Sequence, residues 1–210
     1  MPALTSTTTQ SELPKRRVSE RIGVMGGAFD PIHLGHLVLA MQAYEQLSLT
    51  RLLFVPTFQS AHQNKEIETA FEHRCAMVEA AIENCDQFSL SKIETAVSGK
   101  SYSVKTLQLL RQQYPKAEFF FLMGADSLEQ LETWYLPEEL LAMATVVVAG
   151  RPGYGKPDHP VPERIRFLAM PLLEISASDI RRRVREGRSI RFLVPDRVEA
   201  YILHHGLYRE

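Results

Sequence analysis

The stretch IGVMGGAFDPIHLGH, residues 22–36, decides the fold of this chain. Its first four residues are apolar and end at two glycines, a pattern typical of a buried strand in an α/β sheet. Glycines at a strand end allow a sharp turn and let an anion approach the main-chain N–H groups. Asp30 and Pro31 then predict an extended turn, and the apolar period that begins at Gly35 predicts a helix.

Two histidines, His33 and His36, fall at the start of this helix. A spacing of three places both imidazoles on one face. The free main-chain amides and the positive end of the helix dipole lie at the same helix start as the two imidazoles. The segment therefore predicts a phosphate-binding site. A zinc site or two unrelated surface histidines would share the HxxH spacing. Neither explains the glycines and the Asp-Pro turn that precede it.

The composition indicates one α/β domain, expected over residues 21–210. Of the 210 residues, 45% are hydrophobic, which suffices for one well-buried core. The net charge of −1 gives no global field that attracts nucleic acid or a membrane surface. The longest apolar runs, at 119–123 and 145–149, have the length of strands. We therefore expect neither nucleic acid nor a membrane among the partners of this protein.

Residues 1–20 predict a disordered tail, because they are rich in Ser and Thr and lack an apolar signal core. Two glutamates among them disfavour a transit peptide despite the basic cluster at 15–17. The cysteines Cys75 and Cys85 are ten residues apart, which is neither a redox nor a metal spacing. We expect a reduced, cytoplasmic protein, and whether it forms a homo-oligomer stays open.

Strands and helices are expected to alternate along the chain. This alternation predicts a doubly wound, Rossmann-like parallel sheet with helices on both faces. Helices are predicted near 35–47, 71–85, 104–114, 178–186 and 195–205, and strands near 22–25, 52–55, 88–95, 118–123, 145–149 and 172–175.

Unusual loops follow four of the predicted strands, at 26–27, 124–126, 150–153 and 176–179. Each loop alone would pass as a tight turn. Ligands of a parallel sheet bind outside the carboxyl ends of its strands. Four such loops at one edge therefore predict a nucleotide cleft.

A second phosphate site is predicted where Ser176 and Ser178 open a helix that carries Arg181 one turn later. The hydroxyls and amides would bind triphosphate oxygens, and Arg181 would balance their charge. An ordinary helix cap would use the same residue types. The arginines that follow, between 182 and 191, predict a solvated face, and without interleaved aromatic residues they give little support to nucleic-acid binding.

The stretch GGAFDPIHLGH resembles the signature of the nucleotidyltransferase superfamily, whose HxGH element reads His33-Leu34-Gly35-His36 here. The segment SASDIR, residues 176–181, is similar to the ISSTxIR element of the same superfamily. The resemblance implies transfer of a nucleotidyl group from a nucleoside triphosphate to a phosphate, with release of pyrophosphate. It implies His33, His36 and Arg181 as catalytic residues, ATP bound by Gly26, Gly27, Phe29, Arg151, Ser176 and Ser178, and Mg²⁺ that accompanies ATP and is held mainly by substrate oxygens.

Further motifs resemble the bacterial nicotinate-nucleotide adenylyltransferase family. They are GAD at 124–126, Trp-Tyr at 134–135, GRPG at 150–153, SYS at 101–103, and PD…GLY between 195 and 208. The resemblance implies that ATP and nicotinate mononucleotide give nicotinate adenine dinucleotide and pyrophosphate, in NAD biosynthesis. It implies acceptor binding by Tyr102, Ser103, Asp126, Trp134 and Tyr135, with Trp134 stacking on the pyridine ring and the amides of Tyr102 and Ser103 receiving the carboxylate.

Two positions depart from that family pattern. The Pro-Pro-His-Lys loop reads SAHQ at 60–63, with Lys65 as the nearest lysine, and Lys105 replaces an acid near the acceptor site. Three alternatives therefore stay open: nicotinamide mononucleotide as acceptor, phosphopantetheine as acceptor, and a non-catalytic nucleotide sensor.

Overall fold

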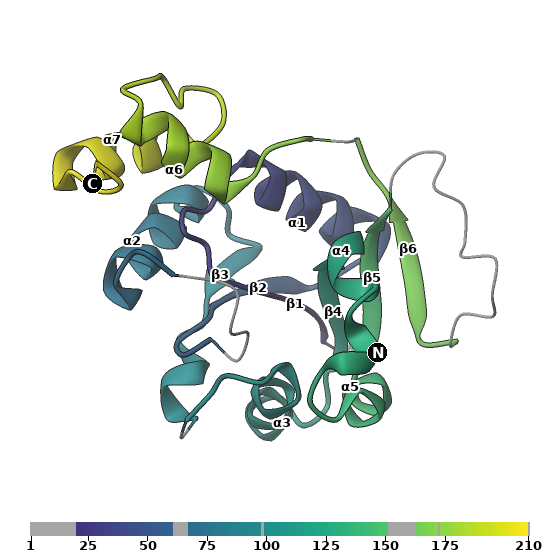
Figure 1. Ribbon diagram of the computed structural model, residues 1–210. Coiled ribbons are helices and arrows are strands. Elements are labelled where there is room, and N and C mark those ends of the chain that lie inside the picture. Colours follow the sequence, from purple (N-terminus) through teal and green to yellow (C-terminus); the bar gives the residue numbers. More distant parts are fainter. Residues whose placement is uncertain (1–19, 61–66, 98, 151–162, 172, 210) are drawn as a thin grey trace, which may run out of the picture.

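The computed structural model describes residues 20–60, 67–97, 99–150, 163–171 and 173–209 (Figure 1). Its centre is a six-stranded parallel sheet in the order β3-β2-β1-β4-β5-β6, which confirms the predicted fold class. The strands are β1 (Arg21–Gly27), β2 (Arg51–Pro56), β3 (Phe88–Leu90), β4 (Glu118–Gly124), β5 (Thr145–Gly150) and β6 (Ile165–Ala169).

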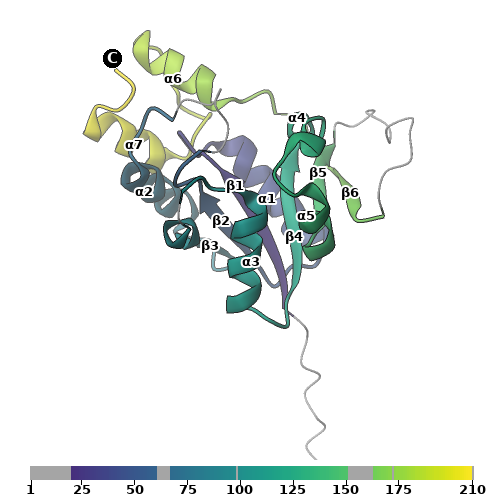
Figure 2. The same ribbon diagram turned by 60° about the horizontal axis from the view of Figure 1, so that its bottom comes forward.

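Helices cover both faces of this sheet. They are α1 (Leu34–Gln46), α2 (Phe71–Ile82), α3 (Ser103–Gln113), α4 (Ala125–Leu128), α5 (Pro137–Met143), α6 (Ala177–Arg185) and α7 (Asp196–His205), with 3₁₀ turns at Ile93–Ala96 and Leu131–Thr133. In Figure 2, α3 and α5 lie on the near face of the sheet and α1 lies behind it.

The two faces form two apolar cores because side chains alternate along each strand. In β4, Phe120 and Leu122 face the core shared with α1, α2 and α7. Phe119 and Phe121 face the opposite core, shared with α3 and α5. Strands buried on both faces read as continuous apolar runs, which is why the sequence predicted them well.

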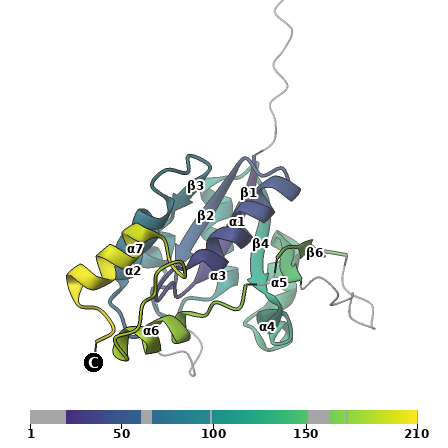
Figure 3. The ribbon, with the colours of Figure 1, turned by 90° about the horizontal axis from the view of Figure 1, so that it is seen from above.

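The strand order reverses between β1 and β4, which are hydrogen-bonded neighbours although two strands separate them in sequence. At such a point the connections after the two neighbouring strands run to opposite sides of the sheet. A crevice therefore opens between them at the carboxyl ends of the strands. Seen from above, α1 covers the central strands and α6 lies near the beginning of α1 (Figure 3). The fold therefore brings a helix from late in the chain to the loop that follows β1.

One predicted strand is wrong. The last strand is β6, Ile165–Ala169, and residues 173–176 have no regular structure. The segment that follows β6 instead connects this edge strand to α6. The predicted strand at 88–95 is also shorter, since β3 ends at Leu90 and a 3₁₀ turn follows. The short helices α4 and α5 were not predicted.

Parts of the chain lie outside these observations. Residues 1–19, nearly all of the predicted disordered tail, are not described, so the tail stays a prediction. The single domain over 21–210 also stays a prediction. None of the helices in the described ranges is both long and apolar enough to cross a membrane.

Candidate active site

A cleft of about 1140 Å³ opens at the carboxyl ends of the central strands. Its walls come from the end of β1, the start of α1, the start of α3, the end of β4 and the start of α6. Predicted site residues that line it are Gly26, Gly27, Phe29, His33, His36, Ser103, Trp134, Ser176, Ser178 and Arg181. These residues belong to four separate segments of the chain, at 26–36, 103, 134 and 176–181, which the fold brings together at one cleft.

The imidazoles of His33 and His36 are stacked, with ring centroids 3.7 Å apart. The main-chain N–H of His33 donates to Nδ1 of His36 over 3.3 Å. Since Nδ1 accepts this bond, the proton of a neutral His36 resides on Nε2. Among the described residues, the buried Nδ1 of His33 has no hydrogen-bond partner. The pair therefore offers an N–H donor and one unsatisfied ring nitrogen.

Both imidazoles are held neutral near pH 7. Burial lowers the pKa of His33 from 6.5 to about 4. Burial, followed by the nearby His33, lowers the pKa of His36 well below the usual value. With these lowered pKa values the two rings act as neutral hydrogen-bonding groups rather than cations. A bound phosphate would favour their protonated forms, because an anion stabilises an adjacent positive charge.

Small residues make room for these rings. A Cβ at Gly35 would lie 3.0 Å from Nδ1 of His33, which is too close for any larger residue without movement. Phe29, at a left-handed φ of 48°, packs its ring edge-to-face on His36 with centroids 5.1 Å apart. A Cβ at Gly27 would lie 3.3 Å from the Phe29 ring. The GGAF and HLGH motifs therefore form one packed unit.

The helix α6 begins at the cleft with Ser176 as its N-cap. The Ser176 hydroxyl accepts a hydrogen bond from the N–H of Asp179 over 3.1 Å, and its oxygen lies 3.1 Å from that of Ser178. The first amides of a helix have no intrahelical partner, so this end can bind anions. Ser176 thus caps the helix, and both serines line the cleft.

Arg181 is fixed by two acceptors. Its Nε donates to Oε1 of Glu68 over 2.7 Å, and its Nη1 donates to the main-chain oxygen of Asp30 over 2.8 Å. Only 15% of the side chain is exposed. The guanidinium therefore lies in the wall of the cleft, between the loop after β1 and the helix α6.

Sequence reasoning missed Asp30 as the centre of a buried network. One carboxylate oxygen accepts from the main-chain N–H of Glu68 over 2.7 Å and of Thr69 over 3.3 Å. The other accepts from the hydroxyl of Tyr208 over 2.6 Å. Burial and the Asp30 carboxylate raise the pKa of Tyr208 well above its usual range. Asp30 was interpreted only as part of a turn, yet it joins three distant segments.

Arg74 was missed as well. This buried side chain donates to the main-chain oxygens of Ala28, Thr57 and Thr69 over 2.7–3.0 Å. It thereby ties together the loops that follow β1 and β2. A signal was available, because Arg74 interrupts the apolar stripe of its helix between Phe71 and Val78.

The opposite end of the cleft is built around the start of α3. Ser101, Ser103 and Thr106 line it, together with Glu94. Glu94 accepts from the N–H of Phe58 over 3.0 Å and from the hydroxyl of Thr106 over 2.9 Å. This buried carboxylate orders the turn that presents the first amides of α3.

Aromatic residues flank the same end. Trp134 lines the cleft and lies edge-to-face against Phe121, with centroids 6.2 Å apart. Tyr102 and Tyr135 contact each other at 4.6 Å but are not among the residues that line the cleft. The Lys105 ammonium lies 5.3 Å over the Tyr102 ring. Trp134 is therefore positioned to contact a ligand directly, whereas Tyr135 packs on the rim.

Two predicted site residues remain unplaced. Arg151 lies outside the described residues, as does the loop that contains His62, Gln63 and Lys65. Asp126 belongs to α4, but its side chain is not among those described.

Comparison with known proteins gives three consistent results. Residues 24–183 match the family model described as cytidylyltransferase-like. A protein of Thermomicrobium roseum named "Probable nicotinate-nucleotide adenylyltransferase" is 43% identical over 196 residues, covering 90% of this chain and 92% of the relative. A protein of Thermus thermophilus with the same name is 44% identical over 189 residues, covering 90% of this chain and all of the relative.

A solved structure shares the fold. The nicotinic acid mononucleotide adenylyltransferase of Plasmodium falciparum, complexed with NaAD, superposes with a TM-score of 0.75. The match covers 90% of this chain and 97% of that one, with 22% identity. At this identity the likeness supports the fold alone.

Proposed function

This chain belongs to the cytidylyltransferase-like family, among the nicotinate-nucleotide adenylyltransferases, and from this premise we propose how its cleft works. It is a nucleotidyltransferase that moves the adenylyl group of ATP to nicotinate mononucleotide and releases pyrophosphate. The product is nicotinate adenine dinucleotide, a step in NAD biosynthesis. One observation carries the proposal: the stacked histidines, the start of α6 and Trp134 all line a single cleft.

In this reaction an acceptor phosphate oxygen bonds to the α-phosphorus of ATP while the bond to the β-phosphate oxygen breaks. The nucleophile is already an anion, so no side chain has to remove a proton from it. The protein must align the two phosphates and stabilise the charge that develops around phosphorus. A cleft with donors on opposite walls suits this task.

The roles of His36 and His33 follow from their hydrogen bonds. We assign the Nε2–H of His36 as a donor to an oxygen of the reacting α-phosphate, because its Nδ1 is held by the main chain of His33. Nδ1 of His33 is buried without a partner among the described residues, so we assign this ring to the phosphates as well. A fixed donor of this kind stabilises a transition state without reorganisation.

The triphosphate would lie between the loop after β1 and the start of α6. Gly26 and Gly27 leave the main chain open to the nucleotide, and Phe29 supports the His36 ring. On the other wall, Ser176, Ser178 and Arg181 would bind the β- and γ-phosphates. Arg151 keeps its proposed role in ATP binding.

Mg²⁺ is proposed to arrive with ATP. Bound to phosphate oxygens, it supplies charge neutralisation of the triphosphate. The carboxylates of Asp30, Glu68 and Glu94 line the cleft, but each accepts hydrogen bonds from protein donors. Within the described residues, no group of three potential ligands is placed to hold a metal ion. The donor set therefore fits an ion that ATP itself carries.

The acceptor would occupy the end of the cleft near α3. Trp134 is proposed to stack on the pyridine ring, with Tyr135 beside it. The amides of Tyr102 and Ser103, at the first turn of α3, would receive the nicotinate carboxylate. Lys105 adds a positive charge to this turn, which favours an acidic acceptor over an amide. Asp126 is proposed to bind a ribose hydroxyl.

An acceptor panel tests the assignment. The protein is incubated with ATP, Mg²⁺ and one acceptor at a time, and pyrophosphate release is followed. We expect the highest kcat/KM with nicotinate mononucleotide. A preference for nicotinamide mononucleotide or phosphopantetheine would overturn the assignment of nicotinate mononucleotide as the acceptor. Binding of ATP without turnover on any acceptor would indicate a nucleotide sensor.

The setting of this reaction is also proposed. We place it in the cytoplasm, where ATP is available and thiols stay reduced, and Cys75 and Cys85 are both free thiols. ATP and a pyridine mononucleotide are its proposed partners; a homo-oligomer remains an expectation.

A further inference from the structure

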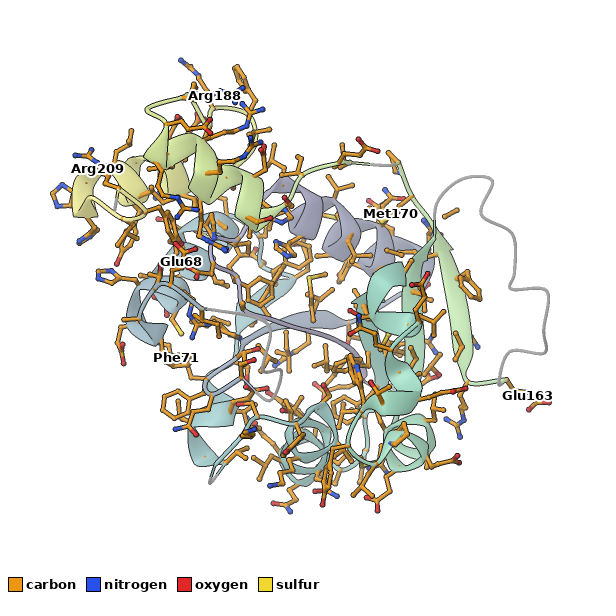
Figure 4. The ribbon with its side chains drawn as sticks, viewed as in Figure 1. Glu68, Phe71, Glu163, Met170, Arg188 and Arg209 are labelled. Atoms are coloured by element: carbon orange, nitrogen blue, oxygen red, sulfur yellow. The ribbon has the colours of Figure 1, made fainter. Side chains whose placement is uncertain are left out.

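Glu68 is held in the wall of the cleft from both of its ends. Its main-chain N–H donates to the buried carboxylate of Asp30 over 2.7 Å. Its own carboxylate accepts from Nε of Arg181 over 2.7 Å and from Nη1 of Arg185 over 2.9 Å. In Figure 4 it lies between α2 and α6. An acid that faces a triphosphate site needs an explanation, since its charge repels phosphate.

The contacts of Arg181 supply that explanation. A guanidinium has five N–H donors on a planar fork. Nε is bound to Glu68 and one Nη1 donor to the main-chain oxygen of Asp30, which fixes the plane of the fork. Among the described residues, no hydrogen bond occupies the remaining donors, which include both on Nη2. Without Glu68, one hydrogen bond from Nη1 would leave this long side chain free to rotate.

We propose that Glu68 is a positioning residue that holds Arg181 in the geometry needed at the transition state. The proposal rests on the proposed function, because Arg181 is assigned there to the phosphates of ATP. Glu68 touches neither the reacting phosphorus nor the acceptor in this role. It acts through the guanidinium, and Arg185 donates to its second oxygen over 2.9 Å.

In this role, removal of the Glu68 carboxylate lowers kcat and the KM for ATP together. Removing the negative charge lowers repulsion toward the triphosphate, so ATP binds more tightly. Removing the bond to Nε loosens Arg181, so the group that stabilises the departing pyrophosphate is misplaced. Loss of alignment reduces kcat, because misplacement by about 1 Å can cost up to about 100-fold in rate. A residue that only stabilised the fold would not lower KM while it lowered kcat.

Two substitutions separate charge from position. Glu68→Gln removes the charge and keeps the shape, and we expect kcat to fall about tenfold while the KM for ATP decreases. Glu68→Asp keeps the charge but shortens the side chain, and we expect a similar loss of kcat with no decrease in KM. Affinity for a non-hydrolysable ATP analogue, measured by calorimetry, should follow the KM values.

The matched control is Glu186→Gln. Glu186 also forms an ion pair with an arginine that follows α6, Arg188, over 3.3 Å. It is not among the residues that line the cleft, and Arg188 lies on the side of α6 away from Glu68 in Figure 4. We expect wild-type kcat and KM from this variant.

A double-mutant cycle provides the decisive measurement. In an Arg181→Ala background, where residue 181 offers no side-chain donor, Glu68→Gln should change kcat less than twofold. Wild-type kcat in both Glu68 variants, or an equal loss of kcat with and without Arg181, overturns the role of Glu68. The proposed function would survive either result, provided that the wild-type chain turns over. If the wild-type chain shows no turnover, both proposals fail.

Discussion

The hydroxyl of Tyr208 donates a 2.6 Å hydrogen bond to the carboxylate of Asp30, a residue 178 positions earlier in the chain. Both side chains are buried. The same carboxylate accepts from the main chain of Glu68, and Asp30 is the second acceptor of Arg181. The end of the described chain therefore supports the loop on which the phosphate-binding residues depend.

The first prediction concerns this bond. Tyr208→Phe keeps the packing but leaves one oxygen of a buried carboxylate without its donor. We expect a loss of about 1–3 kcal/mol in the free energy of unfolding, the usual cost of an unsatisfied buried acceptor. Urea denaturation measures it. Tyr44→Phe, whose ring packs on Phe88 at a partly exposed position, is the control. Equal stability of Tyr208→Phe and wild type would contradict the importance of the network.

The second prediction concerns His36. In His36→Ala the Nε2–H donor is lost, and we expect kcat to fall by a factor that corresponds to about 3–4 kcal/mol of transition-state stabilisation. Binding of an ATP analogue should weaken far less, because this donor is assigned to the transition state. Steady-state kinetics and calorimetry give the two values. Equal losses in both would mean that the imidazole only binds ground-state phosphate.

The third prediction concerns pH and stability. In the folded chain His33 has a pKa of about 4, below the 6.5 of an exposed histidine. Between these two pH values His33 is therefore protonated in the unfolded chain and neutral in the folded chain. Titration of His33 therefore leaves the free energy of unfolding unchanged above pH 6.5 and lowers it as the pH falls from 6.5 toward 4. At pH 5 the loss from His33 amounts to about 2 kcal/mol.

The measurement is urea denaturation at pH 7.5 and pH 5 for wild type and His33→Asn. The variant should lose less stability than wild type over this interval, because it carries one fewer titrating group. Gln112→Asn, an exposed substitution that removes no titrating group, is the control and should leave the pH dependence unchanged. The prediction fails if His33→Asn and wild type lose the same amount.

The fourth prediction concerns acceptor choice. Lys105 lies on the first turn of α3, over the Tyr102 ring. Lys105→Glu replaces attraction by repulsion, and at ~1 kcal/mol for each charge contact in water, ~2 kcal/mol in all, the KM for nicotinate mononucleotide should rise about 30-fold. Use of the amide acceptor should change less. Lys116→Glu, an exposed substitution beyond the end of α3, is the control. An equal rise in KM for the acid and the amide acceptor would mean that Lys105 does not recognise the acceptor carboxylate.

The fifth prediction concerns Mg²⁺. Excess chelator should abolish turnover, and added Mg²⁺ should restore it, because the ion shields the triphosphate. The melting temperature of the ligand-free protein should stay the same, since the described residues hold no group of three potential metal ligands. A chelator-induced drop in melting temperature would indicate a structural metal site elsewhere in the chain.

The stretch from β1 to α1 was predicted closely because its signals are local. A buried parallel strand is a continuous apolar run, and the glycines and the Asp-Pro pair mark the turn after it. His33 and His36 follow this turn, and a separate local signal, serines that open a helix, identified Ser176 and Arg181; all four line one cleft in the structure. Their roles in catalysis remain predictions.

The misplaced last strand has a different cause. β6 is at the edge of the sheet, and its residues alternate only weakly between buried and exposed positions. The apolar residues near 172–175 gave a signal of similar strength, although Leu173 is 39% exposed in the structure. A short edge strand has a hydrogen-bonded neighbour on one side only and is partly exposed. Its composition therefore hardly differs from that of a loop that contains apolar residues.

Asp30 and Arg74 show the limit of pattern reading more clearly. The partners of Arg74 are carbonyl oxygens of Ala28, Thr57 and Thr69, which every residue type would provide. Those of Asp30 include main-chain amides and a tyrosine from the far end of the chain. No spacing rule encodes such contacts, since they exist only once distant loops have been brought together.

The late position of Tyr208 in the chain has a consequence for synthesis on the ribosome. The strands and histidines of the first half emerge early, but the carboxylate that organises their loop lacks its hydroxyl donor until Tyr208 has been translated and released from the exit tunnel. The network around Asp30 is therefore completed only after the segment that carries Tyr208 has been translated.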